Sequence, residues 1–288
     1  MYTSPDEARS DLFLAGAVFL VGPVLLRILL GIFPLSRIPG FDALIALALP
    51  LMTTILVPWL LIRYRKERLA DYGLGGTSSF VLGLVLAAPI AAAGVLAALA
   101  SGGPLLELPL VAAIMTGSWL AFLGRLLYWA GLVGLAVYMT VKARDAFRGD
   151  PAYLRSATVE IGRILALVAG VATVLLLVTV VFSAGGSVLA AVARLLLLPL
   201  GVAAAVLLST QRLRRTTLTK RSTLLTPVVL FAIGPFALSL NALSFVAGLW
   251  QAALLAGVGL VIGALLEARR SALGPVGVGL ALALMTGL

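Results

Sequence analysis

Three arginines, Arg27, Arg125 and Arg194, interrupt long apolar stretches of this sequence. A guanidinium group at bilayer depth is costly and usually faces a partner, a cavity or the membrane interface. Its planar fork also matches phosphate and carboxylate groups. We therefore predict a site for the headgroup of an anionic lipid or a lipid-linked phosphate. The alternative is that each arginine reaches independently to the headgroup layer.

Other groups that could do chemistry are scarce. The chain has no histidine and no cysteine. The absence of both removes the commonest metal ligand, the commonest general base and every thiolate. No phosphate-binding loop of the GxxxxGK[ST] kind occurs either. We therefore expect no enzymatic activity, no metal and no cofactor.

The composition indicates what kind of element carries the arginines. Of the 288 residues, 62% are hydrophobic and only 11% are charged, which is more apolar surface than a water-soluble domain can bury. Repeated apolar runs of about 20 residues match the thickness of a bilayer core. The sequence predicts an all-α, polytopic integral membrane helix bundle, forming a single transmembrane domain over residues 1–288 in the cell membrane.

Nine apolar segments define the predicted spans, and residues 1–11 are predicted to be a short cytoplasmic N-terminus. The segments are 12–34, 42–62, 80–100, 109–148, 164–182, 188–208, 225–240, 245–266 and 273–288. Segment 109–148 is longer than a bilayer requires, so its first turns lie along the interface or the helix is strongly tilted. The last segment is glycine-rich, and the count falls to eight if it is re-entrant.

The basic residues set the predicted orientation. After the second span, loops rich in Lys and Arg, such as 63–68 and 211–221, alternate with loops that contain none. Basic loops stay in the cytoplasm, which predicts a cytoplasmic N-terminus. Arg27 and Arg194 then lie about 10 Å below the outer boundary. The net charge of +10 therefore indicates topology and lipid contact, and we expect no nucleic-acid binding.

One small-residue motif bears on helix packing. Gly259 and Gly263 form a GxxxG pair, which lets two helices approach closely. We interpret the pair as packing within the chain, with dimerisation as the alternative.

The layout of residues 63–288 resembles the CPBP superfamily of intramembrane metalloproteases, which includes CAAX proteases and bacteriocin-processing proteins. The basic loop before "DYGLGG" and the turn "LLEARRSALGP" carry the resemblance. The family's Glu-Glu-x-x-x-Arg motif would fall on "GLAVYM", where Gly134 and Leu135 replace the glutamates and Met139 replaces the arginine. The family also has a final catalytic histidine, and Gly279 or a neighbour falls at that position in this sequence. The resemblance thus implies a pseudoenzyme.

We predict a non-catalytic scaffold or accessory subunit, which binds an anionic lipid or a membrane partner. The basic loops 63–68 and 211–221 are the predicted contacts for a membrane or cytosolic protein. The alternative is a transporter or permease subunit for a small or lipidic solute. Transport usually needs polar groups near the bilayer midplane, and no predicted span carries an acid there.

Overall fold

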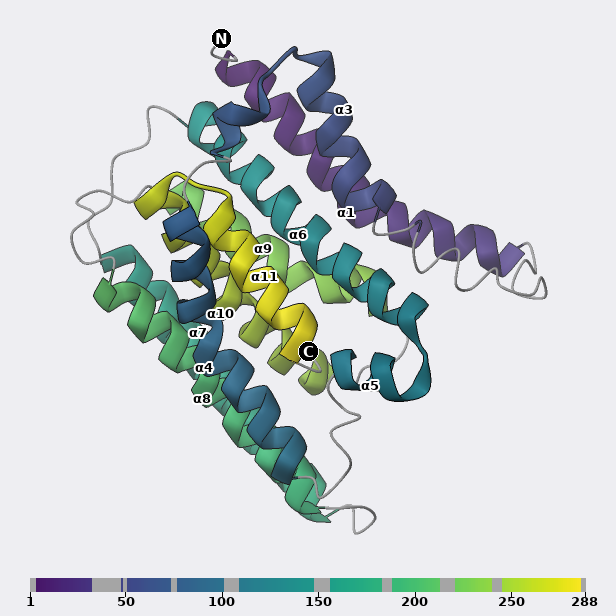
Figure 1. The fold of residues 1–288 in the computed structure, drawn as a ribbon, viewed down its shortest axis with the longest axis vertical. Coiled ribbons are helices and arrows are strands. Elements are labelled where there is room, and N and C mark those ends of the chain that lie inside the picture. Colours follow the sequence, from purple (N-terminus) through teal and green to yellow (C-terminus); the bar gives the residue numbers. More distant parts are fainter. Residues whose placement is uncertain are drawn as a thin grey trace.

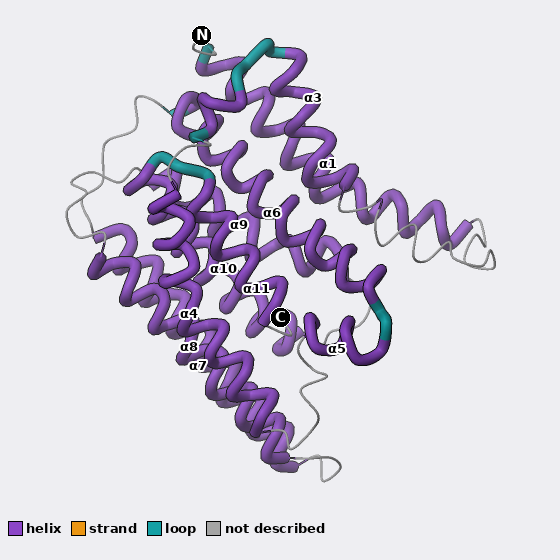
Figure 2. The backbone as a smooth tube through the Cα atoms, in the orientation of Figure 1, coloured by secondary structure: helices purple, strands orange, loops and turns teal. Residues whose placement is uncertain are grey.

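The structure is a computed structural model in which every regular element of the described residues is helical (Figure 1). The described residues are 4–32, 48, 51–73, 77–100, 109–147, 156–182, 188–212, 221–239 and 245–285. Figure 2 follows the helices through these ranges. The all-α prediction is therefore confirmed for this part of the chain.

Twelve helices make up the described part of the chain. They are α1 (Pro5–Ile32), the π-helix η2 (Leu51–Leu56), α3 (Val57–Tyr64), the 3₁₀ helix η3 (Leu69–Tyr72), α4 (Thr77–Ala100), α5 (Pro109–Thr116), α6 (Trp119–Ala146), α7 (Ser156–Phe182), α8 (Val188–Arg212), α9 (Arg221–Ser239), α10 (Phe245–Arg269) and α11 (Leu273–Met285).

Six of the described helices are long and apolar enough to cross a membrane. They cover Pro5–Leu25, Ser78–Ala100, Phe122–Ala146, Glu160–Val180, Ala191–Gln211 and Phe245–Arg269. Shorter apolar helices at Leu51–Tyr64, Thr223–Ile233 and Leu273–Leu284 occupy the predicted second, seventh and ninth spans. Residues 42–47, 49 and 50 of the second span lie outside the described part. The count of nine and the cytoplasmic N-terminus stay predictions.

Helix α10 is the centre of the bundle, and every residue from Ala252 to Leu266 is buried. It packs against α9, α7 and α8. A Cβ atom added at Gly259 would lie 2.4 Å from the carbonyl oxygen of Pro227 on α9, and one at Gly263 would lie 3.0 Å from the ring of the same proline. The GxxxG pair therefore serves packing within the chain, as predicted.

Two groups of helices meet along α6. On one side α1 and η2 contact α6, and on the other α9 and α11 do so. Helix α4 lies between α8 and α11, so that α4, α7 and α8 form one flank of the molecule, while α1 and α3 form the opposite flank (Figure 1).

The predicted single helix over 109–148 is wrong, because the chain breaks after Thr116. Gly117 has φ +68°, a left-handed conformation that glycine adopts without strain. The Thr116 hydroxyl donates to the carbonyl of Ala112 at 2.7 Å, which satisfies one acceptor at the end of α5. The result is a short α5 that precedes the long α6.

Helix α1 begins at Pro5 rather than at the predicted Leu12. Ser4 and Glu7 form a reciprocal cap: the Glu7 backbone N–H donates to the Ser4 hydroxyl at 3.3 Å, and the Ser4 N–H donates to the Glu7 carboxylate at 3.1 Å. Proline is favoured in the first turn, where its missing N–H costs nothing. Most of the predicted N-terminal tail is thus helical, and Asp11 lies two turns inside it.

The segment after α3 is tied to the connection between α10 and α11. The Ala272 N–H donates to the carbonyl of Gly73 at 2.9 Å. Gly73 has φ +76°, and a Cβ atom there would lie 2.2 Å from the carbonyl oxygen of Arg270. Only glycine fits this close contact.

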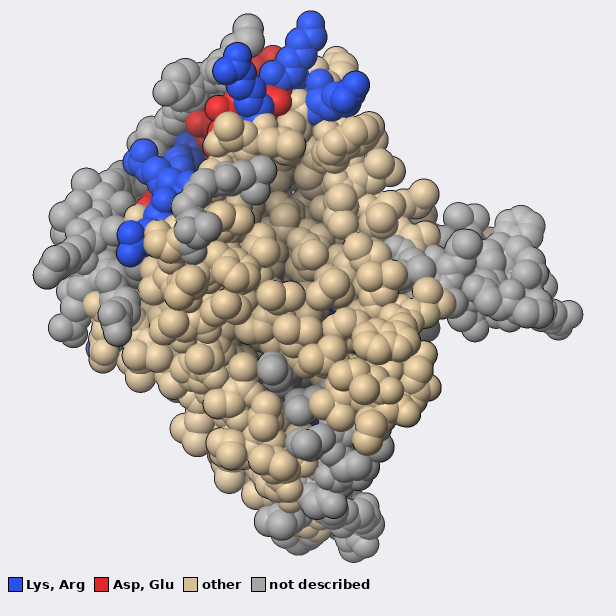
Figure 3. Space-filling view, viewed as in Figure 1, with Lys and Arg blue, Asp and Glu red and all other residues tan. Residues whose placement is uncertain are grey.

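On the face drawn in Figure 3, charged side chains gather at one end. Figure 3 shows one face, on which most visible Lys, Arg, Asp and Glu side chains lie near the N-terminus, while most of the remaining described surface is uncharged. We name this region the charged end. The concentration of charged side chains at this end agrees with the alternation of basic and uncharged loops in the sequence. Each pair of successive spans returns the chain to the same side of the membrane, so alternate loops lie together.

Candidate functional site

The three arginines of the predicted headgroup site lie on three helices. Arg125 is half-buried on α6, and Arg194 is exposed on α8. Arg27 belongs to the last third of α1, and its side chain lies outside the described part.

The structure does not gather these three helices around one pocket. The far end of α1 and the end formed by α7 and α8 occupy separate corners of the molecule (Figure 1). Helix α8 packs mainly on α4, α10 and α7, whereas α1 packs mainly on α6 and α9. A headgroup at any single one of the three arginines stays a prediction.

A different set of charges is brought together at the charged end. We name Asp11, Arg65, Glu67 and Lys142 the charge cluster. The Lys142 ammonium lies 3.0 Å from Asp11 Oδ2 and 2.5 Å from Glu67 Oε1. The side chains of Lys142 and Asp11 are 1% and 3% exposed, and that of Glu67 is 10% exposed. Two buried carboxylates thus hold one buried ammonium group.

Arg65 completes the cluster from its outer side. Its guanidinium donates to Asp11 Oδ1 from Nη2 at 3.1 Å and to Glu7 Oε1 from Nη1 at 3.0 Å. The hydrogen bond to Asp11 raises the pKa of Arg65 above its usual value, because it favours the charged form. Asp11 therefore accepts hydrogen bonds from Arg65 on Oδ1 and forms an ion pair with Lys142 through Oδ2.

Local structure explains how Glu67 reaches this position. After α3 ends, Lys66 adopts φ +55°, and the Glu67 N–H donates to the carbonyl of Ile62 at 3.0 Å. The turn directs the chain back toward α6, so that Glu67 meets Lys142 near the end of that helix. The next turn is capped where the Arg68 N–H donates to the Asp71 carboxylate at 3.2 Å.

Two tyrosines cover the cluster on its inner side. The Tyr72 hydroxyl donates to Glu67 Oε2, and its ring stacks on Tyr138 with centroids 5.8 Å apart. Burial, together with this hydrogen bond, raises the pKa of Tyr72, so the phenol stays protonated as a donor. The Tyr138 ring in turn lies 5.5 Å from the Lys142 ammonium.

We expect removal of the two tyrosine hydroxyls to lower the free energy of unfolding by different amounts. Tyr72→Phe leaves one oxygen of Glu67 without its donor and should lower the free energy of unfolding by about 1.5–3 kcal/mol. Tyr138→Phe removes a buried hydroxyl that has no hydrogen-bond partner among the described residues and should be close to neutral. Equilibrium unfolding of both purified variants in detergent mixtures tests the contrast, and equal losses would contradict it.

The charge cluster joins α1, α6 and the segment after α3. Its cations and carboxylates are engaged with one another, and among the described residues no group of three or more acidic side chains is placed to hold a metal ion. The sequence analysis missed the cluster, because it placed Asp11 in a cytoplasmic N-terminal tail and did not single out Lys142 as its partner. The available signal was the Ser4–Glu7 cap, which extends α1 to include Asp11.

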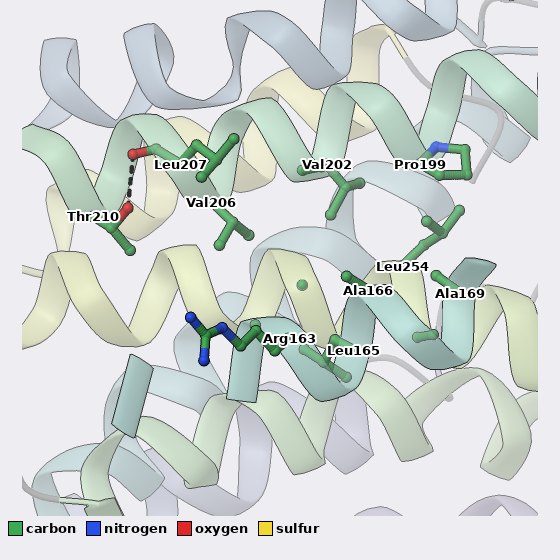
Figure 4. A pocket seen from close by; sticks show the side chains of 14 residues that line it. Arg163, Leu165, Ala166, Ala169, Pro199, Val202, Val206, Leu207, Thr210 and Leu254 are labelled. Atoms are coloured by element: carbon green, nitrogen blue, oxygen red, sulfur yellow. Dashed lines mark hydrogen bonds between the residues drawn. The ribbon is translucent and has the colours of Figure 1, made fainter. Parts of the chain in front are cut away.

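A second candidate feature is an apolar groove between α7, α8 and α10, which we name the α7–α8–α10 groove. Its volume is about 350 Å³. Figure 4 shows Arg163 and Thr210 toward one end and Pro199 and Ala169 toward the other. A third feature, the α1–α6–α9 groove, has a volume of about 280 Å³ and is lined by residues such as Phe19, Met139 and Leu230.

The positions that the CPBP resemblance singled out lie on packed helices. A Cβ atom at Gly279 on α11 would lie 2.7 Å from the Val133 side chain on α6, one residue before Gly134. Leu135 is buried and apolar, and Gly134 is exposed. None of these positions offers a group that could polarise water.

The chain matches no protein-family model, no curated protein and no solved structure. The resemblance to the CPBP superfamily therefore stays a prediction.

Proposed function

We propose that this chain is a non-catalytic multi-spanning membrane protein that acts as a scaffold or accessory subunit and binds an anionic lipid or a membrane partner. One observation carries the proposal: the buried charges of the charge cluster are directed at one another. Ionisable groups within membrane helices are functional candidates by default. Here Lys142 is held between Asp11 and Glu67, an arrangement that favours a rigid support.

The charged end also offers basic side chains to a partner. Of the predicted contact 63–68, Arg65 is engaged in the charge cluster. Arg63, Lys66 and Arg68 are exposed, and we name them the basic patch. Within 211–221, Gln211 is exposed and residues 213–220 lie outside the described part. An acidic surface on a partner, or an anionic leaflet, fits the basic patch by charge.

The alternative, a permease subunit, has less support. A transport path usually contains polar groups near the bilayer midplane. The α7–α8–α10 and α1–α6–α9 grooves are lined mainly by apolar side chains. We therefore rank the scaffold first.

The test is copurification from native membranes. The triple variant Arg63→Glu, Lys66→Glu and Arg68→Glu should lose most of the partner protein that the wild-type chain retains, because like charges repel at the contact. The matched control, Arg63→Lys with Arg68→Lys, keeps the charge and should retain the partner. A partner bound equally by all three proteins would argue against the basic patch, and a wild-type chain with no stable partner would argue against the scaffold.

Charge reversal could also invert the chain in the membrane, so orientation needs its own control. The sequence has no cysteine, and a single cysteine at exposed Gln211 therefore reports which side of the membrane the end of α8 faces. Labelling by an impermeant reagent only after permeabilisation, in wild-type and triple-variant backgrounds alike, would show that the loss of partner is not a change of topology.

A further inference from the structure

The α7–α8–α10 groove exists because small side chains line its walls. Gly162 and Ala166 are one turn apart on α7, Ala203 lies on α8, and Ala253 and Gly257 are one turn apart on α10. Facing small residues leave a hollow that the longer neighbours do not fill. The volume of about 350 Å³ lies within the range of about 300–1,000 Å³ that is typical of ligand sites.

The length of the groove matches one leaflet. Pro199 and Thr210 both line it, and they are separated by about 16 Å along α8 at 1.5 Å per residue. Half of a hydrocarbon core is about 15 Å. An extended acyl chain from a single leaflet therefore fits the groove along its axis.

One end of the groove carries a cation. Arg163 is exposed, and the ion pairs among the described residues involve Arg9, Arg65, Lys142 and Arg144 instead. Glu160, one turn earlier on α7, is exposed and does not pair with Arg163. Its guanidinium points toward the end of the groove where Thr210 lies (Figure 4).

The cation also lies at the depth of a headgroup. Arg163 is three residues inside the candidate span Glu160–Val180, and Thr210 is one residue from the end of Ala191–Gln211. At 1.5 Å per residue, both lie within about 5 Å of the span ends. A cation at this depth, beside an apolar groove one leaflet long, matches the two parts of a phospholipid.

We propose that the α7–α8–α10 groove binds an anionic phospholipid, with one acyl chain along α8 and α10 and the headgroup phosphate on Arg163. The site lies in the leaflet that contacts the start of α7 and the end of α8. It is distinct from the predicted arginine site, because Arg194 lies near the opposite end of α8. It deepens the proposed function by naming a lipid, but it uses none of the basic patch, so the two proposals can fail separately.

The α1–α6–α9 groove supplies a control within the same molecule. It is also apolar and its volume is about 280 Å³, but the described residues that line it include no lysine or arginine. Lipid chains should enter it without regard to headgroup charge.

The experiment uses the full chain in phosphatidylcholine vesicles that contain a trace of one photoactivatable lipid. The lipid is either phosphatidylglycerol or phosphatidylcholine, with the reactive group at the end of the acyl chain. Crosslinked peptides are mapped by mass spectrometry. We expect the anionic probe to label the α7–α8–α10 groove about fivefold more than the zwitterionic probe, the preference that one basic residue near the surface provides. The α1–α6–α9 groove should show no preference.

Three variants separate the headgroup from the chain. Arg163→Gln should abolish the preference for the anionic probe at the α7–α8–α10 groove, while Arg163→Lys should keep most of it. Ala166→Leu should reduce labelling by both probes there, because it fills the groove. Equal labelling by the two probes in the wild-type protein, an unchanged preference in Arg163→Gln, or labelling absent from this groove would each overturn the proposal. Labelling of the α1–α6–α9 groove confirms that each variant is folded.

Discussion

Replacing Lys142 by methionine should lower the free energy of unfolding by about 3–5 kcal/mol, the cost typical of removing one partner from a buried ion pair. The variant leaves the carboxylates of Asp11 and Glu67 facing each other without the ammonium group that now separates them. Asp11 is buried and the Glu67 side chain is only 10% exposed, so water replaces the lost cation poorly. Equilibrium unfolding of the purified protein in detergent mixtures measures the loss.

Neutralising the carboxylates together with the lysine should restore much of the stability. In the triple variant Lys142→Met, Asp11→Asn and Glu67→Gln, no buried charge remains unpaired at this position, and such replacements are often close to neutral. The surface control is Arg9→Met, which breaks an exposed pair with Asp6 and should cost no more than about 0.5 kcal/mol. A Lys142→Met protein as stable as Arg9→Met would show that the cluster does not hold α1 to α6.

Replacing Gly83 by valine should be the most damaging change to helix packing, with a loss of about 3 kcal/mol or more. A Cβ atom at Gly83 on α4 would lie 2.0 Å from the carbonyl oxygen of Gly274 at the start of α11. The obstacle is backbone, which cannot rotate away, so α4 and α11 must separate. Equilibrium unfolding in detergent mixtures measures the loss of free energy, and the yield of monodisperse protein gives a second measure of stability.

The matched control is Gly134→Val on α6. Gly134 is exposed, and a Cβ atom there meets no heavy atom within 4 Å. Both changes place the same side chain in a helix interior, so their difference isolates the contact between α4 and α11. If the Gly83 and Gly134 variants unfold alike, the close approach of these two helices is not required for stability.

The helical class could be predicted because apolar length is a property of each segment alone. The gathering of charges at one end follows from the alternation of basic loops, which is also visible in the sequence. The break at Gly117 was missed, because a glycine inside an apolar run is tolerated in many membrane helices. Its left-handed conformation depends on how α5 and α6 pack.

The candidate sites were harder to predict for a different reason. Glu67 and Lys142 are separated by 75 positions, and Asp11 and Arg65 by 54, so their pairing depends on the relative placement of three segments. Glu160 and Arg163 lie three residues apart on α7, a spacing that allows an ion pair on a helix, yet their side chains form none. A spacing of three residues on one helix permits an ion pair, but it does not show whether solvent or a neighbouring side chain competes for either charge.

The hydrogen bond between Gly73 and Ala272 has a consequence for the order of biosynthesis. The lysine at position 142 can find its two carboxylates as soon as α6 has been made, since every member of that group precedes it. The carbonyl of Gly73, by contrast, must wait until α10 and Ala272 have been made before it receives this hydrogen bond. The nascent protein can therefore pair the charges of the charge cluster before α7 is made, whereas the contact between Gly73 and Ala272 forms only after α10 has been made.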